Sequence, residues 1–375
     1  MMTTHTSLSV SENDTVATDL ADAQGDAAAT VHADGPDFDF SSASTDSFLR
    51  FLQQEHLSIA VSSYDCHRVI VFRSIGDEVD TLLVPAISVK GIAATEDSLT
   101  FANITELVTY RRCDEVLATS ARPELEGADA LYLPRSVHVT GDINAHDLAW
   151  GDAGLWLVNS RFNCLCTLDP MLGFKVRWQP FFKQTLDTAS AGHLNGMAMH
   201  AGKPVFASCF APVADNWRER DGSRQDGAII DVERNELILE GLFMPHSPRV
   251  HEGGLYVCNS GTGEVLRFDL RTRALRSVIT LPCFTRGLRF YKHYMLVCCS
   301  QVRHSNAKSN NTLFEHFEEN VAGLYIVDLH TEQVVAYTEF LGDVSQLYDI
   351  ALIPNTLTPF IPGLNDPINK NLYVY

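Results

Sequence analysis

Three histidines stand near the starts of short apolar segments, in local contexts that resemble one another. Their contexts are Asn144-Ala145-His146-Asp147, His193-Leu194-Asn195 and Pro245-His246-Ser247. Three imidazoles brought together can bind a divalent metal, or serve as general acids and bases. Asp147 or Asp349 could then be a fourth ligand or orient a ring. The pattern predicts a reactive site at His146, His193 and His246, with a divalent metal as its candidate cofactor.

A structural role is the alternative for each of these histidines, because a histidine between β-strands often serves only as a hydrogen-bonding link. Recurrence at three corresponding positions is what favours a shared site. The chain has no G-x-S-x-G, no P-loop and no G-x-G-x-x-G. The sequence therefore does not point to the nucleophile or phosphate-cradle chemistry of those motifs.

Four arginines form a second candidate group. A guanidinium grips a carboxylate or phosphate with two parallel hydrogen bonds, so arginines at one site favour a small anionic ligand. The alternative is pairing with acidic neighbours such as Asp147, Asp349 or Glu315. Arg286 is the strongest candidate, because Thr285-Arg286-Gly287 begins a repeat. The full set of expected ligand-binding residues is Arg161, Asn195, Arg249, Arg286, Arg303 and Tyr348.

An internal repeat supplies the elements that would position these residues. In each copy a turn-forming residue precedes two or three apolar residues, and a second apolar strand follows, usually ending in Ser or Asn. Successive copies lie 39 to 62 residues apart, which is typical of one four-stranded propeller blade with variable loops. The repeats begin at Lys90-Gly91-Ile92, His146-Asp147-Leu148, Asn195-Gly196-Met197, Ser247-Pro248-Arg249, Arg286-Gly287-Leu288 and Tyr348-Asp349-Ile350.

The two ends of the repeat region complete each other. Residues 57–85 look like outer strands without an inner one, and Tyr348–Ile353 looks like an inner strand without partners. Joined in one blade, they would close the ring and leave no unpaired edge. We therefore predict an all-β, six-bladed β-propeller closed by N- and C-terminal strands. Its inner strands would begin around the mouth of a central channel, and residues 210–226 and 302–322 would form long loops on the same face.

The charge composition distinguishes the predicted ring from the N-terminal segment before it. The 375 residues carry a net charge of −19, yet residues 1–47 alone hold nine carboxylates and neither Lys nor Arg. We predict a disordered acidic tail over 1–50, the propeller over 51–356 and a C-terminal extension over 357–375. An acidic body disfavours nucleic acid as a partner, and no apolar run approaches the length of a membrane span.

Cysteine usage bears on the compartment. The count of nine is odd, several cysteines lie within apolar runs, and the N-terminus lacks the basic and apolar regions of a secretory signal. The prediction is reduced, buried thiols in a cytoplasmic protein.

The repeat motifs also carry a resemblance to a family. His146-Asp147-Leu148-Ala149-Trp150, Met244-Pro245-His246-Ser247-Pro248-Arg249 and Phe284-Thr285-Arg286-Gly287-Leu288 resemble an uncharacterised bacterial family of conserved hypothetical proteins, over about residues 55–354. This implies a bacterial propeller and brings no known activity.

A looser likeness, at the level of fold, is to six-bladed propellers of the gluconolactonase and strictosidine synthase kind. It implies a site at the channel mouth, where Asn195 and Asp349 would be metal ligands. Histidines stand here where such an enzyme would have Glu or Asn, and a fold does not carry a function.

Two functions from different classes fit these observations. The first is binding or transformation of a small anionic molecule at the mouth, by the histidines with Arg286 and Arg161. The second is a non-catalytic scaffold that binds a peptide or protein partner on the same face. A convergence of ionisable groups would favour the first, because an interaction surface has little reason to bury them.

Overall fold

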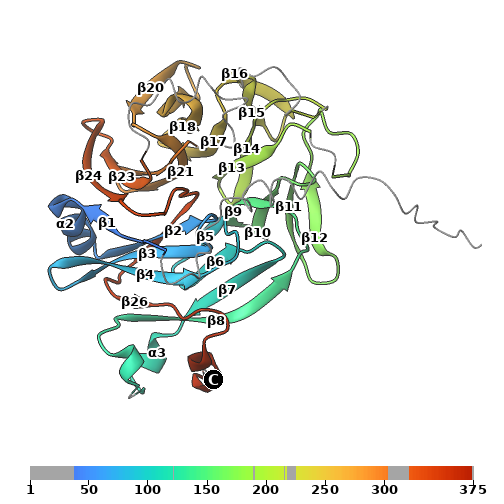
Figure 1. Cartoon of the computed structure of the whole chain (residues 1–375). Helices are drawn as coiled ribbons and strands as arrows, with labels where there is room; N and C mark the ends of the chain where they lie inside the picture. The colour runs from blue at the N-terminus through green and yellow to red at the C-terminus, as the bar shows by residue number, and fades with distance from the viewer. Residues whose placement is uncertain are drawn as a thin grey trace, which may run out of the picture.

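The strands of the chain form six sheets around a common axis (Figure 1). The computed structural model describes residues 38–120, 122–188, 191–214, 216–217, 225–302 and 321–373. The inner strands contact one another in sequence around the ring, and the last of them contacts the first. The fold is a six-bladed β-propeller, as the repeat predicts.

Each blade is a four-stranded antiparallel meander, with its inner strand at the axis. The first two blades comprise β5 (Ile92–Ala94), β6 (Ser98–Ala102), β7 (Glu106–Arg112) and β8 (Ala130–Val139), then β9 (Ala145–Gly151), β10 (Gly154–Asn159), β11 (Cys164–Asp169) and β12 (Gly173–Trp178). The next three comprise β13 (Leu194–His200), β14 (Lys203–Cys209), β15 (Gly227–Asp231), β16 (Glu236–Leu242); β17 (Pro245–His251), β18 (Gly254–Asn259), β19 (Glu264–Asp269), β20 (Leu275–Thr280); and β21 (Phe284–Tyr291), β22 (Tyr294–Ser300), β23 (Gly323–Asp328), β24 (Gln333–Phe340).

The sixth blade joins the two ends of the repeat region, which confirms the predicted closure. Its order is β25 (Ile350–Pro354), β2 (Leu57–Ser63), β3 (Arg68–Ile75) and β4 (Glu78–Pro85). Both neighbouring blades gain a fifth strand from the flanking chain. On one side β1 (Ser42–Ser44) pairs with the outer edge of β24, and on the other β26 (Pro359–Phe360) pairs in parallel with β8. Closure is therefore reinforced on both sides of the seam.

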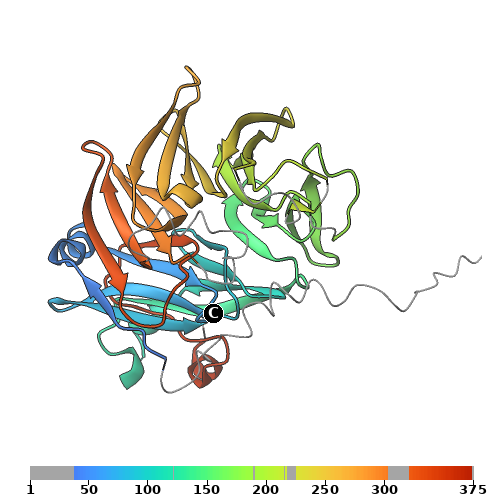
Figure 2. The ribbon, with the colours of Figure 1, turned by 45° about the horizontal axis from the view of Figure 1, so that its top comes forward.

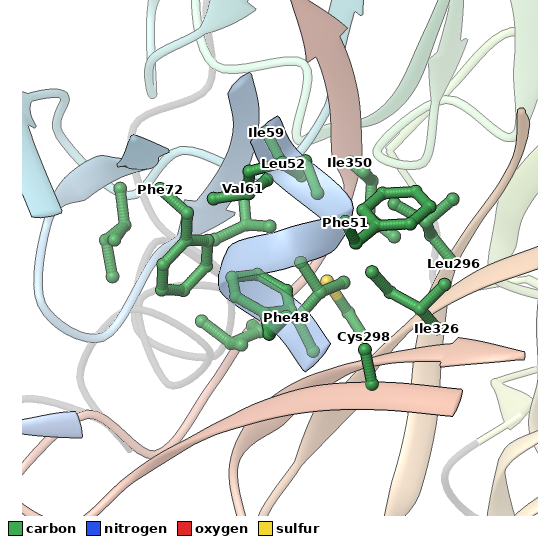
Figure 3. Close-up of a cluster of buried hydrophobic side chains, with 14 of the residues drawn as sticks. Phe48, Phe51, Leu52, Ile59, Val61, Phe72, Leu296, Cys298, Ile326 and Ile350 are labelled. Carbon is green, nitrogen blue, oxygen red and sulfur yellow. The ribbon is translucent and has the colours of Figure 1, made fainter. Parts of the chain in front are cut away.

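The predicted boundary between the tail and the propeller, at residue 50, falls inside a helix. Helix α2 (Asp46–Glu55) starts at Thr45, whose hydroxyl accepts from the Phe48 amide, and ends at His56 in the left-handed conformation. Its residues Phe48, Phe51 and Leu52 are buried against the closing blade and β22–β23 (Figure 3). Their i, i+3, i+4 spacing is the helical signal that the acidic, Ser/Thr-rich surroundings concealed.

The C-terminal extension also packs on the ring. Beyond β26, a short helix η5 (Pro367–Asn371) lies beside an insertion between β7 and β8 that holds α3 (Asp114–Leu117) and η1 (Pro123–Leu125) (Figures 1 and 2). Ile368 and Leu372 share one apolar cluster with Cys113 and Val116 of the insertion. Among the described residues, no helix is long and apolar enough to cross a membrane.

The redox state of one pair of cysteines differs from the predicted reduced thiols. Cys283 and Cys299 form a disulfide, with their Cα atoms 5.5 Å apart. The other seven are free and buried, as the apolar runs around them predict. Burial raises the pKa of Cys66, Cys209 and Cys258 to about 12, so these thiols stay protonated and inert at neutral pH.

Candidate functional site

The polar residues singled out in the sequence meet at the end of the ring where the inner strands begin. We call His146, His193, His246, Arg286 and Tyr348 the mouth cluster. Three of the inner strands start after a residue in the left-handed conformation, at Asn144, His193 and Met244. In each of the three blades, this turn places the first residues of the inner strand beside the axis.

The predicted equivalence of the three histidines needs one correction. Ala145, Leu194 and Pro245 each begin an inner strand and pair with the last residue of the following strand. The residues next in line are therefore His146, Asn195 and His246. His193 lies in the preceding turn, one residue before β13, because this blade has Asn at the register position that carries His in two others.

His146 and His246 share the same local hydrogen-bond pattern. The Nδ1 atom of His146 lies 2.8 Å from the carbonyl oxygen of Asn144, and that of His246 lies 3.0 Å from the carbonyl of Met244. A carbonyl only accepts, so both Nδ1 atoms carry the proton and both Nε2 atoms are acceptors. The His246 Nδ1–H is shared with the Ser260 hydroxyl at 2.8 Å.

Burial keeps both rings neutral. It holds the pKa of His146 and of His246 well below the ordinary value, and the positive charges of Lys90 and Arg286 respectively act in the same direction. The mouth cluster therefore combines two uncharged acceptors with nearby cations, inside a chain that is acidic as a whole.

Tyr348 lies at the centre of the cluster. Its ring centroid is 5.6 Å from that of His146 and 6.0 Å from that of His246, and the Arg286 guanidinium lies 5.2 Å from it. The side chain is buried, and no described residue forms a hydrogen bond with its hydroxyl. Burial raises the pKa of this phenol, so it remains a donor at neutral pH.

Aromatic rings outside the predicted set of catalytic and ligand-binding residues surround these groups. The Arg286 guanidinium also lies over Phe284 at 5.0 Å and over Tyr64 at 5.7 Å. His193 stacks on Phe210 with centroids 4.6 Å apart and an interplanar angle of 25°. Trp217 contacts both rings of that pair. Two of these rings could have been assigned to the site from their position in the sequence, because Phe210 directly follows β14 and Phe284 begins β21.

The two predicted aspartates are engaged away from the histidines. Asp147 accepts two hydrogen bonds from Arg249, at 2.8 and 3.1 Å, and Asp349 lies 3.5 Å from the same guanidinium. Arg289, which the sequence argument did not include, reaches Asp349 at 3.8 Å. The prediction that an aspartate orients a histidine ring gains no support from these contacts, because backbone carbonyls hold the Nδ1 atoms of His146 and His246.

Arg249 links several blades through its side chain. Besides Asp147 and Asp349, it donates to the carbonyl oxygens of Leu288, Met197 and Pro248. All of its N–H groups are thus used inside the protein. Its expected role in ligand binding gains no support from these contacts, which match the alternative of pairing with Asp147 and Asp349.

The remaining predicted residues lie in different settings. Asn195 links two blades, because its amide donates to the Pro245 carbonyl at 2.8 Å and its Oδ1 accepts from Ser208 at 2.6 Å. Arg161 forms an ion pair with Asp142. Arg303 lies outside the described residues, as do most of the predicted loop 302–322 and part of the predicted loop 210–226.

The spacing of the donor atoms bears on the metal predicted at His146, His193 and His246. His146 and His193 are close, with ring centroids 4.8 Å apart. Within the described residues, however, the one group of three His, Cys, Asp or Glu side chains with ligand atoms mutually within 4.8 Å is His293, Asp328 and His330. Among the described residues, the histidines of the mouth cluster do not form such a group.

Comparisons with known proteins found one matching family model and several similar solved structures. Residues 46–361 match the model of a family described as "Domain of unknown function (DUF4915)". A crystal structure of a nidogen/laminin complex has a chain 11% identical, with a TM-score of 0.49, covering 80% of this chain and 99% of that one. A protein of unknown function from Bacteroides caccae is 12% identical, with a TM-score of 0.47, covering 79% and 98%. None of the curated proteins compared matches the chain.

Proposed function

The chain belongs to the DUF4915 family, whose description names no activity. From the geometry of the mouth cluster, we propose that it binds a small organic anion that also carries hydroxyl groups. Arg286 would hold the anionic group. His146 and His246 would accept hydrogen bonds from the hydroxyl groups, and the aromatic rings around them would exclude water.

The buried hydroxyl of Tyr348 is the observation that carries this proposal. A buried hydroxyl without a partner costs roughly 1–3 kcal/mol, and such groups in native proteins call for an explanation. Phenylalanine would fill nearly the same volume without that cost. A bound molecule that accepts from the Tyr348 hydroxyl would account for the tyrosine, and a carboxylate beside Arg286 is such an acceptor.

The tautomers of His146 and His246 narrow the class of ligand. Two Nε2 lone pairs repel a bare anion, so a molecule that fits both the histidines and Arg286 must present O–H or N–H donors as well as negative charge. Hydroxy acids combine the two. A depressed pKa also makes both imidazoles weak bases, so the arrangement favours binding over proton transfer.

Calorimetric titration of the full chain with malate, tartrate and gluconate tests this proposal. We expect at least one hydroxy acid to bind, with succinate weaker than malate because succinate lacks the hydroxyl. Arg286→Ala should weaken binding about tenfold or more, as expected for a lost charge-assisted hydrogen bond.

Arg271→Ala is the matched control, because the Arg271 side chain is exposed in the turn after β19, and this variant should bind like the wild type. Equal binding by the Arg286→Ala and Arg271→Ala variants would contradict the assignment of the site. Equal affinity for succinate and malate would contradict the role given to the histidines.

A further inference from the structure

A second cluster of metal-ligating side chains lies far from the mouth. His293 lies in the turn between β21 and β22, Asp328 ends β23, and His330 lies in the turn between β23 and β24. One ligand atom from each of the three lies within 4.8 Å of the other two. Strand β21 begins at the mouth and spans about 23 Å to Tyr291, at ~3.3 Å per residue, so the two sites are at opposite ends of this blade.

The backbone holds the three residues in place. Tyr294 pairs with Asp328 in the β22–β23 ladder, and the Leu329 amide donates to the His293 carbonyl at 2.9 Å. The Asp328 carboxylate accepts from the His330 amide at 2.8 Å, which fixes the turn. The two imidazole rings stack with centroids 4.7 Å apart. Two turns distant in sequence are therefore already positioned to present their side chains together.

We propose that His293, Asp328 and His330 bind a divalent transition metal, with Zn²⁺ as the ion that this donor set favours. Two imidazoles and one carboxylate are ligands that Zn²⁺ takes in proteins, with a fourth position left for water. A hard cation such as Mg²⁺ or Ca²⁺ prefers oxygen ligands and fits this set poorly.

The neighbouring charges leave the carboxylate available for a metal. Lys292 pairs with Glu55, and Glu332 pairs with Arg276. Within the described residues, Asp328 forms no ion pair. Zn–N bonds of about 2.0–2.1 Å bring the ligands of a tetrahedral centre to roughly 3.3 Å from one another. His330 is exposed, so its side chain can rotate inward to close the remaining gap.

Zinc titration of the chelator-treated full chain tests the site. We expect the wild type to bind one more equivalent of Zn²⁺ at micromolar concentration than His330→Ala does. Asp328→Asn keeps an oxygen for the His330 amide and removes the charge, so it should weaken this equivalent about tenfold or more. The control is His200→Ala, because His200 is an exposed histidine near the turn between β13 and β14, and it should bind like the wild type.

Cobalt provides an independent readout. Co²⁺ bound by the same ligands should give visible absorption bands that the His330→Ala protein lacks and the His200→Ala protein retains. Should His330→Ala unfold, His330→Gln replaces it, with far-UV circular dichroism confirming the fold. Equal zinc stoichiometry in the wild type, the His330 variant and the Asp328 variant would overturn the proposal.

Discussion

The guanidinium of Arg249 on β17 and the carboxylate of Asp147 on β9 form a buried, bidentate ion pair between the inner strands of two non-adjacent blades. The Nη1–Oδ2 and Nη2–Oδ1 distances are 2.8 and 3.1 Å, and the two residues are 8% and 3% exposed. Their blades are separated by the β13–β16 blade, whose Met197 amide also donates to Asp147. The pair therefore ties three blades together at a single point.

Asp147→Asn should destabilise the protein by about 3–5 kcal/mol, because it leaves the Arg249 charge buried without its main partner. Urea unfolding followed by tryptophan fluorescence measures this change. Asp142→Asn is the control: its partner Arg161 is half-buried and Asp142 itself is exposed, so the cost should stay under about 1 kcal/mol. Similar costs for the two variants would mean that the buried network is not what holds the blades together.

Tyr348→Phe and Tyr64→Phe should differ in their effect on stability. The Tyr348 hydroxyl has no hydrogen-bond partner in the described structure, so its removal should leave stability unchanged or raise it by up to about 1 kcal/mol. The Tyr64 hydroxyl donates to Gln346 Oε1 at 2.6 Å, so its removal should cost about 1 kcal/mol. Thermal unfolding of the two variants side by side distinguishes them, and a loss of stability in Tyr348→Phe would show that this hydroxyl is satisfied within the protein.

Acidification should destabilise the fold through His146 and His246. Their pKa in the folded state lies below the ordinary 6.5, so the unfolded chain binds more protons, and stability falls as pH drops below about 6.5. The slope approaches about 1.4 kcal/mol per pH unit for each histidine.

The double variant His146→Gln, His246→Gln should therefore show a flatter profile in urea unfolding at pH 7, 6 and 5. Asp349, whose pKa burial raises, acts in the opposite direction, but it is present in both proteins and cancels in the comparison. Parallel profiles for the wild type and the double variant would refute this account of the histidines.

Phe48→Ala should cost about 3–5 kcal/mol, because Phe48 is fully buried and meets Phe72 of the closing blade edge to face at 5.7 Å (Figure 3). Chemical unfolding of the full chain measures the loss. Leu172→Ala is the control, since Leu172 is 75% exposed, and it should change stability by no more than about 0.5 kcal/mol. If the two variants proved equally stable, α2 would be dispensable to the ring.

The ring could be predicted from the sequence because its signals are local and repeated. Each blade restates a turn residue, an apolar inner strand and a second strand, as at Asn195-Gly196-Met197 and Arg286-Gly287-Leu288. The same repetition predicted which residues begin the inner strands, and hence that His146, His246, Arg286 and Tyr348 would meet. Helix α2 was not predicted because its signal is a single, unrepeated set of apolar residues, three of them buried, next to an acidic segment.

What each side chain does at the mouth was decided by tertiary structure alone. Arg249 lies in the inner strand β17 and Arg286 in the inner strand β21, yet their surroundings differ. Arg249 donates to carboxylates and carbonyls of other blades, whereas the Arg286 guanidinium lies over the rings of Phe284 and Tyr348. His193 lies two residues before the register position that His146 and His246 occupy in their blades, and strand pairing sets this offset. Local patterns in the sequence were enough to predict the blades and the end of the ring where the polar groups gather. The partners of those groups depend on contacts between blades, which no local pattern encodes.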